Sequence, residues 1–187
     1  MANSEQDHIN QIRRDKYWLN ENGRLKGVNP LASDLHNSIQ ALAQDLNNKD
    51  THFILELIQN AEDNDYQVAE PSLSLKLLIT DPTNTNGTSG ALIFQNNEVG
   101  FLAENVNAIC AVGHTTKSKV QGYIGEKGIG FKSVFRVTSI PHILSKGYRF
   151  CLPKEDQETG LGFIVPKWID IPPNGTDLNQ TTIILPL

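Results

Sequence analysis

The sequence of 187 residues is 39% hydrophobic and 20% charged, which is the composition of an ordinary globular domain and excludes a disordered or fibrous chain. Its net charge of −5 excludes a general basic field for nucleic acid or anionic lipid, although a local basic patch is compatible with it. No apolar run approaches the roughly 18 residues of a membrane span and no signal-peptide core opens the chain, so we expect a cytoplasmic or nuclear protein without a membrane partner.

Three helices are predicted in the first third of the chain, because hydrophobic residues recur there at three- and four-residue spacing. The predicted ranges are residues 6–20, 33–46, and 50 or 51 to about 64. Ser33 is placed to cap the second helix, and glycines and a proline separate it from the first. We therefore divide the chain into an N-terminal helical extension, residues 1–30, and one domain, residues 31–187.

Strand-like runs dominate the rest of the chain. They cover residues 73–80, 91–95, 143–145, 148–152, 163–165 and 182–187, with short helices predicted at 104–112 and 131–137. Helices early, strands late and little regular alternation favour an α+β fold, a two-layer α/β sandwich with a mixed or antiparallel sheet. Cys110 and Cys151 lie in apolar surroundings, and we interpret them as small core residues of a reducing compartment rather than a disulfide.

The third predicted helix carries a row of polar side chains. Glu56, Asn60 and Asp63 lie at i, i+4 and i+7, so they share one helical face. An asparagine oxygen is a suitable ligand for Mg²⁺, and a glutamate one turn away is suited to orient or deprotonate a water. A plain solvated helix face is the alternative interpretation of the same row.

A glycine-rich segment at residues 113–130 is more specific. Four glycines in nine residues precede the helix predicted at 131–137, so backbone N–H groups and a helix N-terminus can approach phosphate oxygens closely. The segment is neither a Walker A loop nor the dinucleotide fingerprint. A flexible, turn-rich loop is the alternative. Four lysines supply positive charge in or beside the segment: Lys117, Lys119, Lys127 and Lys132.

In their order and spacing, these motifs resemble those of the GHKL ATPases. The row from Glu56 to Asp63 resembles the N-box of that family, and residues 124–133 are similar to the second glycine motif of heat-shock chaperones. Residues 111–117 resemble the start of the ATP lid, and residues 181–187 the final strand. The sequence around residues 50–64 and 122–135 most resembles that of the sacsin-type, NO VEIN-like ATPase domains. The resemblance implies the Bergerat fold, in which helices cover one face of a mixed, mostly antiparallel sheet.

The resemblance also implies roles for individual residues. Glu56 matches the general base, Asn60 the Mg²⁺ ligand and Asp63 a carboxylate of the nucleotide pocket. Thr181 matches a threonine beside the adenine. The remaining nucleotide-binding positions fall in the lid and the glycine motif, at Thr116, Lys117, Gly125, Lys127, Gly128, Ile129, Gly130 and Phe131.

One motif departs from the family. The D-x-G-x-G motif that recognises adenine is represented here by residues 96–100, where Asn96 replaces the aspartate, Glu98 replaces a glycine and only Gly100 is retained. The Asn96 carbonyl oxygen can still accept a hydrogen bond from the adenine amino group, although without charge, and a flipped amide would suit a base carbonyl instead. Because glutamate does not favour glycine-only conformations, we expect ordinary backbone at Glu98.

The resemblance implies a Mg²⁺-dependent, ATP-binding domain with slow hydrolysis, which acts as a chaperone-like conformational switch in a larger protein. The expected partners are the nucleotide, downstream domains of the same chain and a nucleotide-dependent dimer, whereas nucleic acid is not expected for this domain alone. Efficient ATPase turnover would need the additional domains. The alternative is a non-catalytic nucleotide-sensing or adaptor module with relaxed base recognition. A histidine kinase would need a phospho-accepting histidine, and His36 is better explained as a surface or packing residue.

Overall fold

A six-stranded sheet organises the chain in a computed structural model that describes residues 4–17, 19, 20, 22, 24, 27, 31–45, 52–68, 70–112 and 130–187. In space the strands follow the order β1-β2-β6-β3-β4-β5, and every neighbouring pair is antiparallel. Their bounds are β1 (Leu73–Leu78), β2 (Ala91–Asn96), β3 (His142–Ser145), β4 (Tyr148–Cys151), β5 (Lys167–Trp168) and β6 (Thr181–Pro186).

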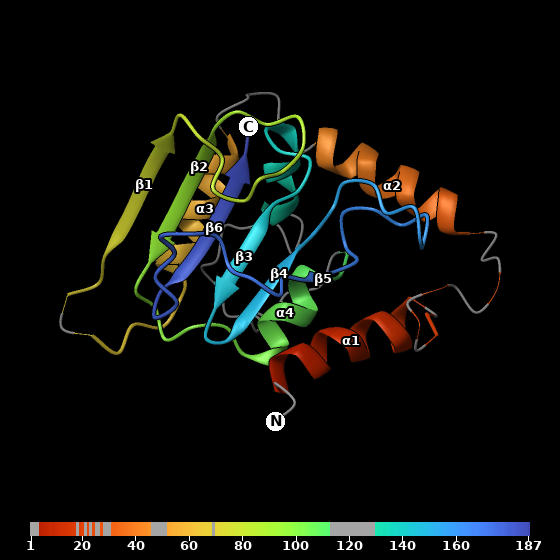
Figure 1. Ribbon diagram of the computed structural model, residues 1–187, viewed down its shortest axis with the longest axis horizontal. Coiled ribbons are helices and arrows are strands. Elements are labelled where there is room, and N and C mark those ends of the chain that lie inside the picture. Colours follow the sequence, from red (N-terminus) through yellow and green to blue (C-terminus); the bar gives the residue numbers. More distant parts are fainter. Residues whose placement is uncertain are drawn as a thin grey trace, which may run out of the picture.

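The helices complete the two-layer sandwich that the sequence predicts (Figure 1). They are α1 (Ser4–Lys16), α2 (Ala32–Asp45), α3 (His52–Glu62), α4 (Ala103–Ile109) and the 3-10 helix η1 (Gly130–Arg136). Figure 1 shows α3 behind β2 and β6. In the part of the chain that the structure describes, no helix is long and apolar enough to cross a membrane.

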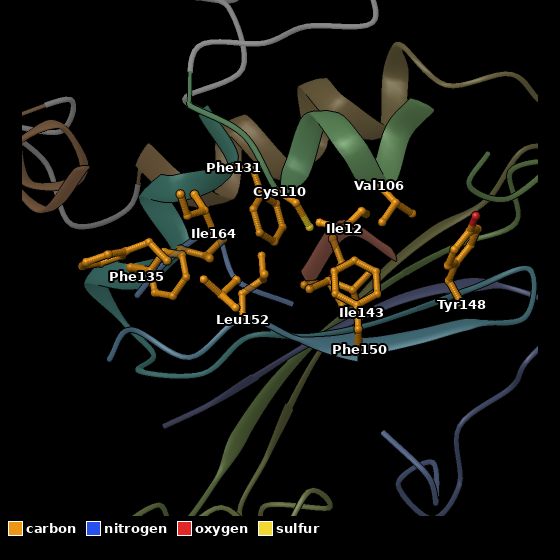
Figure 2. Packing of buried hydrophobic residues seen from close by; sticks show 14 of the residues in the cluster. Ile12, Val106, Cys110, Phe131, Phe135, Ile143, Tyr148, Phe150, Leu152 and Ile164 are labelled. Atoms are coloured by element: carbon orange, nitrogen blue, oxygen red, sulfur yellow. The ribbon is translucent and has the colours of Figure 1, made fainter. Parts of the chain in front are cut away.

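One row of apolar side chains runs across the helix-covered face of the sheet. Strand register pairs Phe94 with Ile183, Ile183 with Ile143, and Ile143 with Phe150, so all four side chains point to the same face. They belong to one buried cluster together with side chains from the helices. Figure 2 shows Ile143 and Phe150 of this row between the strands and the helices, with Val106 and Cys110 of the α4 region opposite them. Burial of this row fixes which face of the sheet lies against the helices.

The N-terminal helix packs into the same core. Ile9 and Leu19 are fully buried, and the Tyr17 hydroxyl donates to the carbonyl oxygens of Cys110 and Ile164 at 2.5 and 2.8 Å. The helix ends at Lys16, four residues earlier than predicted, because Tyr17 and Leu19 reach the core from non-helical backbone. Apolar spacing alone does not distinguish these two ways of burying a side chain.

Two further predictions differ from the structure. Residues 163–165 are buried but form a turn instead of a strand: Phe163 has φ +70° and its N–H donates to the Pro153 carbonyl oxygen at 2.8 Å. The segment is apolar because it fills the core, and its backbone pairs with no strand. The helix predicted at 131–137 is a 3-10 helix. Both cysteines are free and buried, as predicted.

Candidate functional site

The first half of the candidate site lies where α3 meets η1. The two helices pack together, and a Cβ atom built on Gly130 would lie only 2.0 Å from Oε2 of Glu56. The carboxylate therefore rests directly on the backbone at which the glycine-rich segment enters η1. Nδ1 of His52, one turn earlier on α3, lies 3.6 Å from the other oxygen of Glu56, which is beyond hydrogen-bond length. Fold and helix packing thus bring together two motifs that are 74 positions apart in the sequence.

The rest of the polar face of α3 points away from the core. Phe53, Leu57 and Ala61 are buried against it, while Asn60 and Asp63 are exposed. The helix therefore has the two-sided character that the sequence predicts, with Glu56 at the border between its two sides. Within the described ranges, no group of three or more His, Cys, Asp or Glu side chains is arranged to hold a metal ion.

The second half of the candidate site is a polar end of the sheet. β2 and β3 end, and β6 begins, at the same edge (Figure 1), and Asn96 pairs with Thr181 in the register of β2 and β6. The hydroxyl oxygens of Ser145 and Thr181 lie 2.5 Å apart, and the Phe101 N–H donates to Ser145 Oγ at 2.8 Å. Asn96, Ser145 and Thr181 are each at most 3% exposed, so three adjacent strands present a buried polar layer on the helix side.

Glu98 adds a carboxylate to this layer. It is 9% exposed, and its Oε1 accepts a hydrogen bond from Thr181 Oγ1 at 2.6 Å. Burial raises the pKa of the Glu98 carboxyl, while the Thr181 hydrogen bond acts in the opposite direction. The backbone N–H of Glu98 donates to Asn96 Oδ1 at 3.3 Å, so the Asn96 oxygen expected to face a base already accepts one hydrogen bond within the chain.

Gly100 is a position where only glycine fits. Its φ is +87°, and an added Cβ would lie 2.5 Å from the Cβ of Lys146. Glu98, by contrast, is absent from the residues of positive φ in the described part of the chain, as expected for a side chain in place of glycine. The motif therefore keeps glycine at position 100, where the backbone requires it, and carries a glutamate at position 98, where the backbone does not.

Comparison with known proteins now gives this arrangement a family. A family model described as the Sacsin domain matches residues 32–157. Over 163 residues the chain is 42% identical to Protein NO VEIN of Arabidopsis thaliana, a match that covers 84% of this chain and 6% of that protein. The chain belongs to the Sacsin domain family. It spans a small part of the length of the relative it matches.

Several predicted site positions of this Sacsin domain fall outside the described residues. They are Thr116, Lys117, Gly125, Lys127, Gly128 and Ile129. Of the glycine segment, Gly130 and Phe131 are described, and Phe131, the second residue of η1, lies in the core cluster. Its predicted contact with nucleotide stays a prediction.

Lys132 does not supply phosphate-binding charge, contrary to our expectation. Its side chain is buried, and Nζ donates to the carbonyl oxygens of Ile109 and Phe163 at 2.5 and 3.0 Å. Burial lowers the pKa of its ammonium group to about 8. Lys132 instead ties η1 to the C-terminal end of α4, where Lys16 and Tyr17 also donate to the Cys110 carbonyl oxygen.

The sequence interpretation missed three contributors to the site. His52 precedes Glu56 by one helical turn, a spacing visible in the sequence. Ser145 joins Thr181 through strand register, which no local motif reveals. Glu98 was considered only as a lost glycine, although a charged residue inside a glycine-type turn was itself a signal. His36 is a packing residue, since its Nδ1 accepts the Gly162 N–H at 3.2 Å.

Proposed function

We propose that this Sacsin domain binds Mg²⁺-ATP along the polar side of α3 and hydrolyses it slowly, as a conformational switch within a larger protein. The observation that carries the proposal is the contact between Glu56 and Gly130. A water-activating carboxylate is useful only beside the transferred phosphate, and a glycine backbone at a helix start is a suitable phosphate cradle. Their direct contact supports one reaction centre.

The residues present fit a bound magnesium ion. Mg²⁺ keeps several waters and substrate phosphate oxygens and takes only one or two protein oxygens, so a dedicated cluster of acidic ligands is not needed. The Asn60 side chain is exposed on α3 one turn from Glu56 and offers such an oxygen. When bound, the ion would neutralise charge that develops on the phosphates.

The protein groups would then divide the work along α3. Glu56 holds an attacking water and accepts its proton, and the neighbouring imidazole of His52 limits where the carboxylate can swing. Asn60 would hold the metal, and Asp63 follows three residues later, just beyond the end of α3. Downstream domains or a second copy of the chain would respond to hydrolysis.

Calorimetry with ATP, ADP and GTP, with and without Mg²⁺, tests binding separately from chemistry. We expect Mg²⁺-dependent binding of ATP, and single-turnover phosphate release that Glu56→Ala abolishes without loss of affinity. Hydrolysis that survives Glu56→Ala would remove Glu56 from the mechanism. Absence of heat with every nucleotide would refute the proposed function and leave a scaffold role.

A second candidate function is a non-catalytic nucleotide sensor or adaptor with relaxed base recognition. The altered motif at residues 96–100 favours it, because Asn96 replaces a charged acceptor. Nucleotide binding with equal affinity in wild type and Glu56→Ala, and no phosphate release from either protein in the presence of its downstream domains, would select this alternative.

A further inference from the structure

The polar end of the sheet contains a chain of hydrogen bonds whose direction is fixed. The Phe101 N–H can only donate, and it donates to Ser145 Oγ. The Thr181 hydroxyl gives its one proton to Glu98 Oε1, so the short contact between Ser145 and Thr181 must be donated by Ser145. Every donor therefore points toward Glu98, and the chain ends on an acceptor.

This arrangement keeps a carboxylate in a buried position without an ion pair among the described residues. Burying a charge costs free energy unless it is paired, and Glu98 sits where the backbone does not need glycine. Of the donors that the structure describes, only the Thr181 hydroxyl reaches the carboxylate. One oxygen is thus held in place, and the group keeps capacity to accept from a ligand.

Glu98 also lines a cavity of about 340 Å³, within the range of small-molecule sites. Three of the other lining residues are apolar, Val68, Val99 and Leu102, and the rest are polar or charged, namely Asp65, Gln67, Asn97 and Lys146. The segment after α3 is joined to the motif, because the Val99 N–H donates to the Asp65 carbonyl oxygen at 3.0 Å. The cavity therefore lies at the C-terminal end of α3, whereas Glu56 and Gly130 meet nearer its start. A flat ring that packs on the three apolar residues, with a polar edge toward Glu98, suits this space.

We propose that Glu98, rather than Asn96, selects the base of the nucleotide, by accepting a hydrogen bond from an exocyclic amino group. This inference rests on the proposed nucleotide-binding function. Asn96 Oδ1 already accepts one hydrogen bond from the Glu98 N–H, which uses one of its two acceptor positions. The Asn96 amide is uncharged and can also present its NH₂, which suits a base carbonyl, whereas the Glu98 carboxylate only accepts. Hydrogen bonds to an ionised group are roughly twice as strong as neutral ones, so Glu98 prevails and the site prefers a 6-amino purine.

The test compares Mg²⁺-ATP with Mg²⁺-ITP, two nucleotides that differ at the 6-position by an amino group against a carbonyl. We expect wild type to bind ATP about tenfold more tightly, and Glu98→Gln to bring the two affinities within about threefold of each other, because an uncharged amide loses the charge-assisted hydrogen bond to the amino group. Glu104→Gln, the same change on the exposed surface of α4, is the matched control and should keep the preference.

The outcomes separate this inference from the proposed function. Equal affinities in wild type, or an undiminished preference in Glu98→Gln, would overturn the role of Glu98 while nucleotide binding stands. Absence of binding with both nucleotides would overturn the proposed function and this inference with it. Glu98→Gln is nearly isosteric and still accepts from Thr181, so it should fold. If urea unfolding shows otherwise, Thr181→Val replaces it, and a preference unchanged by the loss of the Thr181 donor would refute the inference.

Discussion

Substituting alanine for Gly130 tests the geometry at the centre of the candidate site. The added Cβ would lie 2.0 Å from Oε2 and 3.0 Å from Cδ of Glu56, and real Cβ atoms essentially never approach another atom within 3.0 Å. Gly130 is not among the described glycines of positive φ, so alanine suits the backbone itself. The whole effect of Gly130→Ala should therefore fall on the Glu56 side chain, which must withdraw.

The magnitude follows from two opposing terms. Forcing Glu56 off its rotamer costs about 0.5–1.5 kcal/mol, while alanine gains about 0.4–1 kcal/mol by restricting the unfolded chain. The terms nearly cancel, so we expect the free energy of unfolding to change by less than about 1 kcal/mol. In a Glu56→Ala background the first term disappears. Gly130→Ala should then stabilise the protein, and the double-mutant cycle should give a coupling energy of about 1 kcal/mol.

Urea unfolding of the four proteins in the cycle measures this coupling, and Gly27→Ala, which has nothing within 4 Å, is the control for a simple glycine-to-alanine gain. Additive effects of the two substitutions would refute the contact. If the proposed function holds, the displaced carboxylate should also slow single-turnover hydrolysis about a hundredfold at unchanged affinity. A loss of affinity equal to the loss of rate would place the role of Gly130 in binding instead.

Three further predictions concern buried polar groups. Tyr17→Phe removes the donor shared by the carbonyl oxygens of Cys110 and Ile164 and should cost about 1–3 kcal/mol in urea unfolding, more than Tyr148→Phe, whose hydroxyl contacts the half-buried His8. Desolvation lowers the pKa of His142, so as the pH falls the unfolded chain binds a proton at this position before the folded chain does. The free energy of unfolding should therefore decrease as the pH falls below about 6.5. A His142→Asn variant should show a shallower decrease between about pH 7.5 and 5.5. Because burial raises the pKa of Glu98, its charge is disfavoured in the folded state at neutral pH. Glu98→Gln should therefore be more stable than wild type at pH 7 and lose that advantage as pH falls through the raised pKa. An equal or lower stability of Glu98→Gln at pH 7 would contradict this prediction.

The sequence predicts the parts of the fold that depend on local periodicity. α2, α3, β1 and β2 lie within a few residues of their predicted bounds, since apolar residues recur in each with a regular spacing. The sequence does not separate a buried strand from a buried turn, so residues 163–165 were assigned to the wrong class. Nor does it separate a lysine that binds phosphate from one that caps carbonyl oxygens, and Lys132 is the second kind.

For the candidate site, spacing along one helix predicted that Glu56 and Asn60 share a face, but not what they meet. The contact of Glu56 with Gly130 depends on how η1 packs on α3. The polar layer depends on the register of β2, β3 and β6, three strands that are spread along the chain between residues 91 and 186. The places of Glu98 and Ser145 in the site therefore depend on neighbours that are distant in sequence, and local sequence patterns do not predict them.

The position of β6 has a consequence for how the domain forms. β6 is the last strand along the chain, yet it lies between β2 and β3 and pairs with both. The hairpins β1–β2 and β3–β4 can form early from local contacts, but they become one sheet only when residues 181–186 insert between them. Because Thr181 is the first residue of that strand, assembly of the sheet and completion of the polar layer are the same late step.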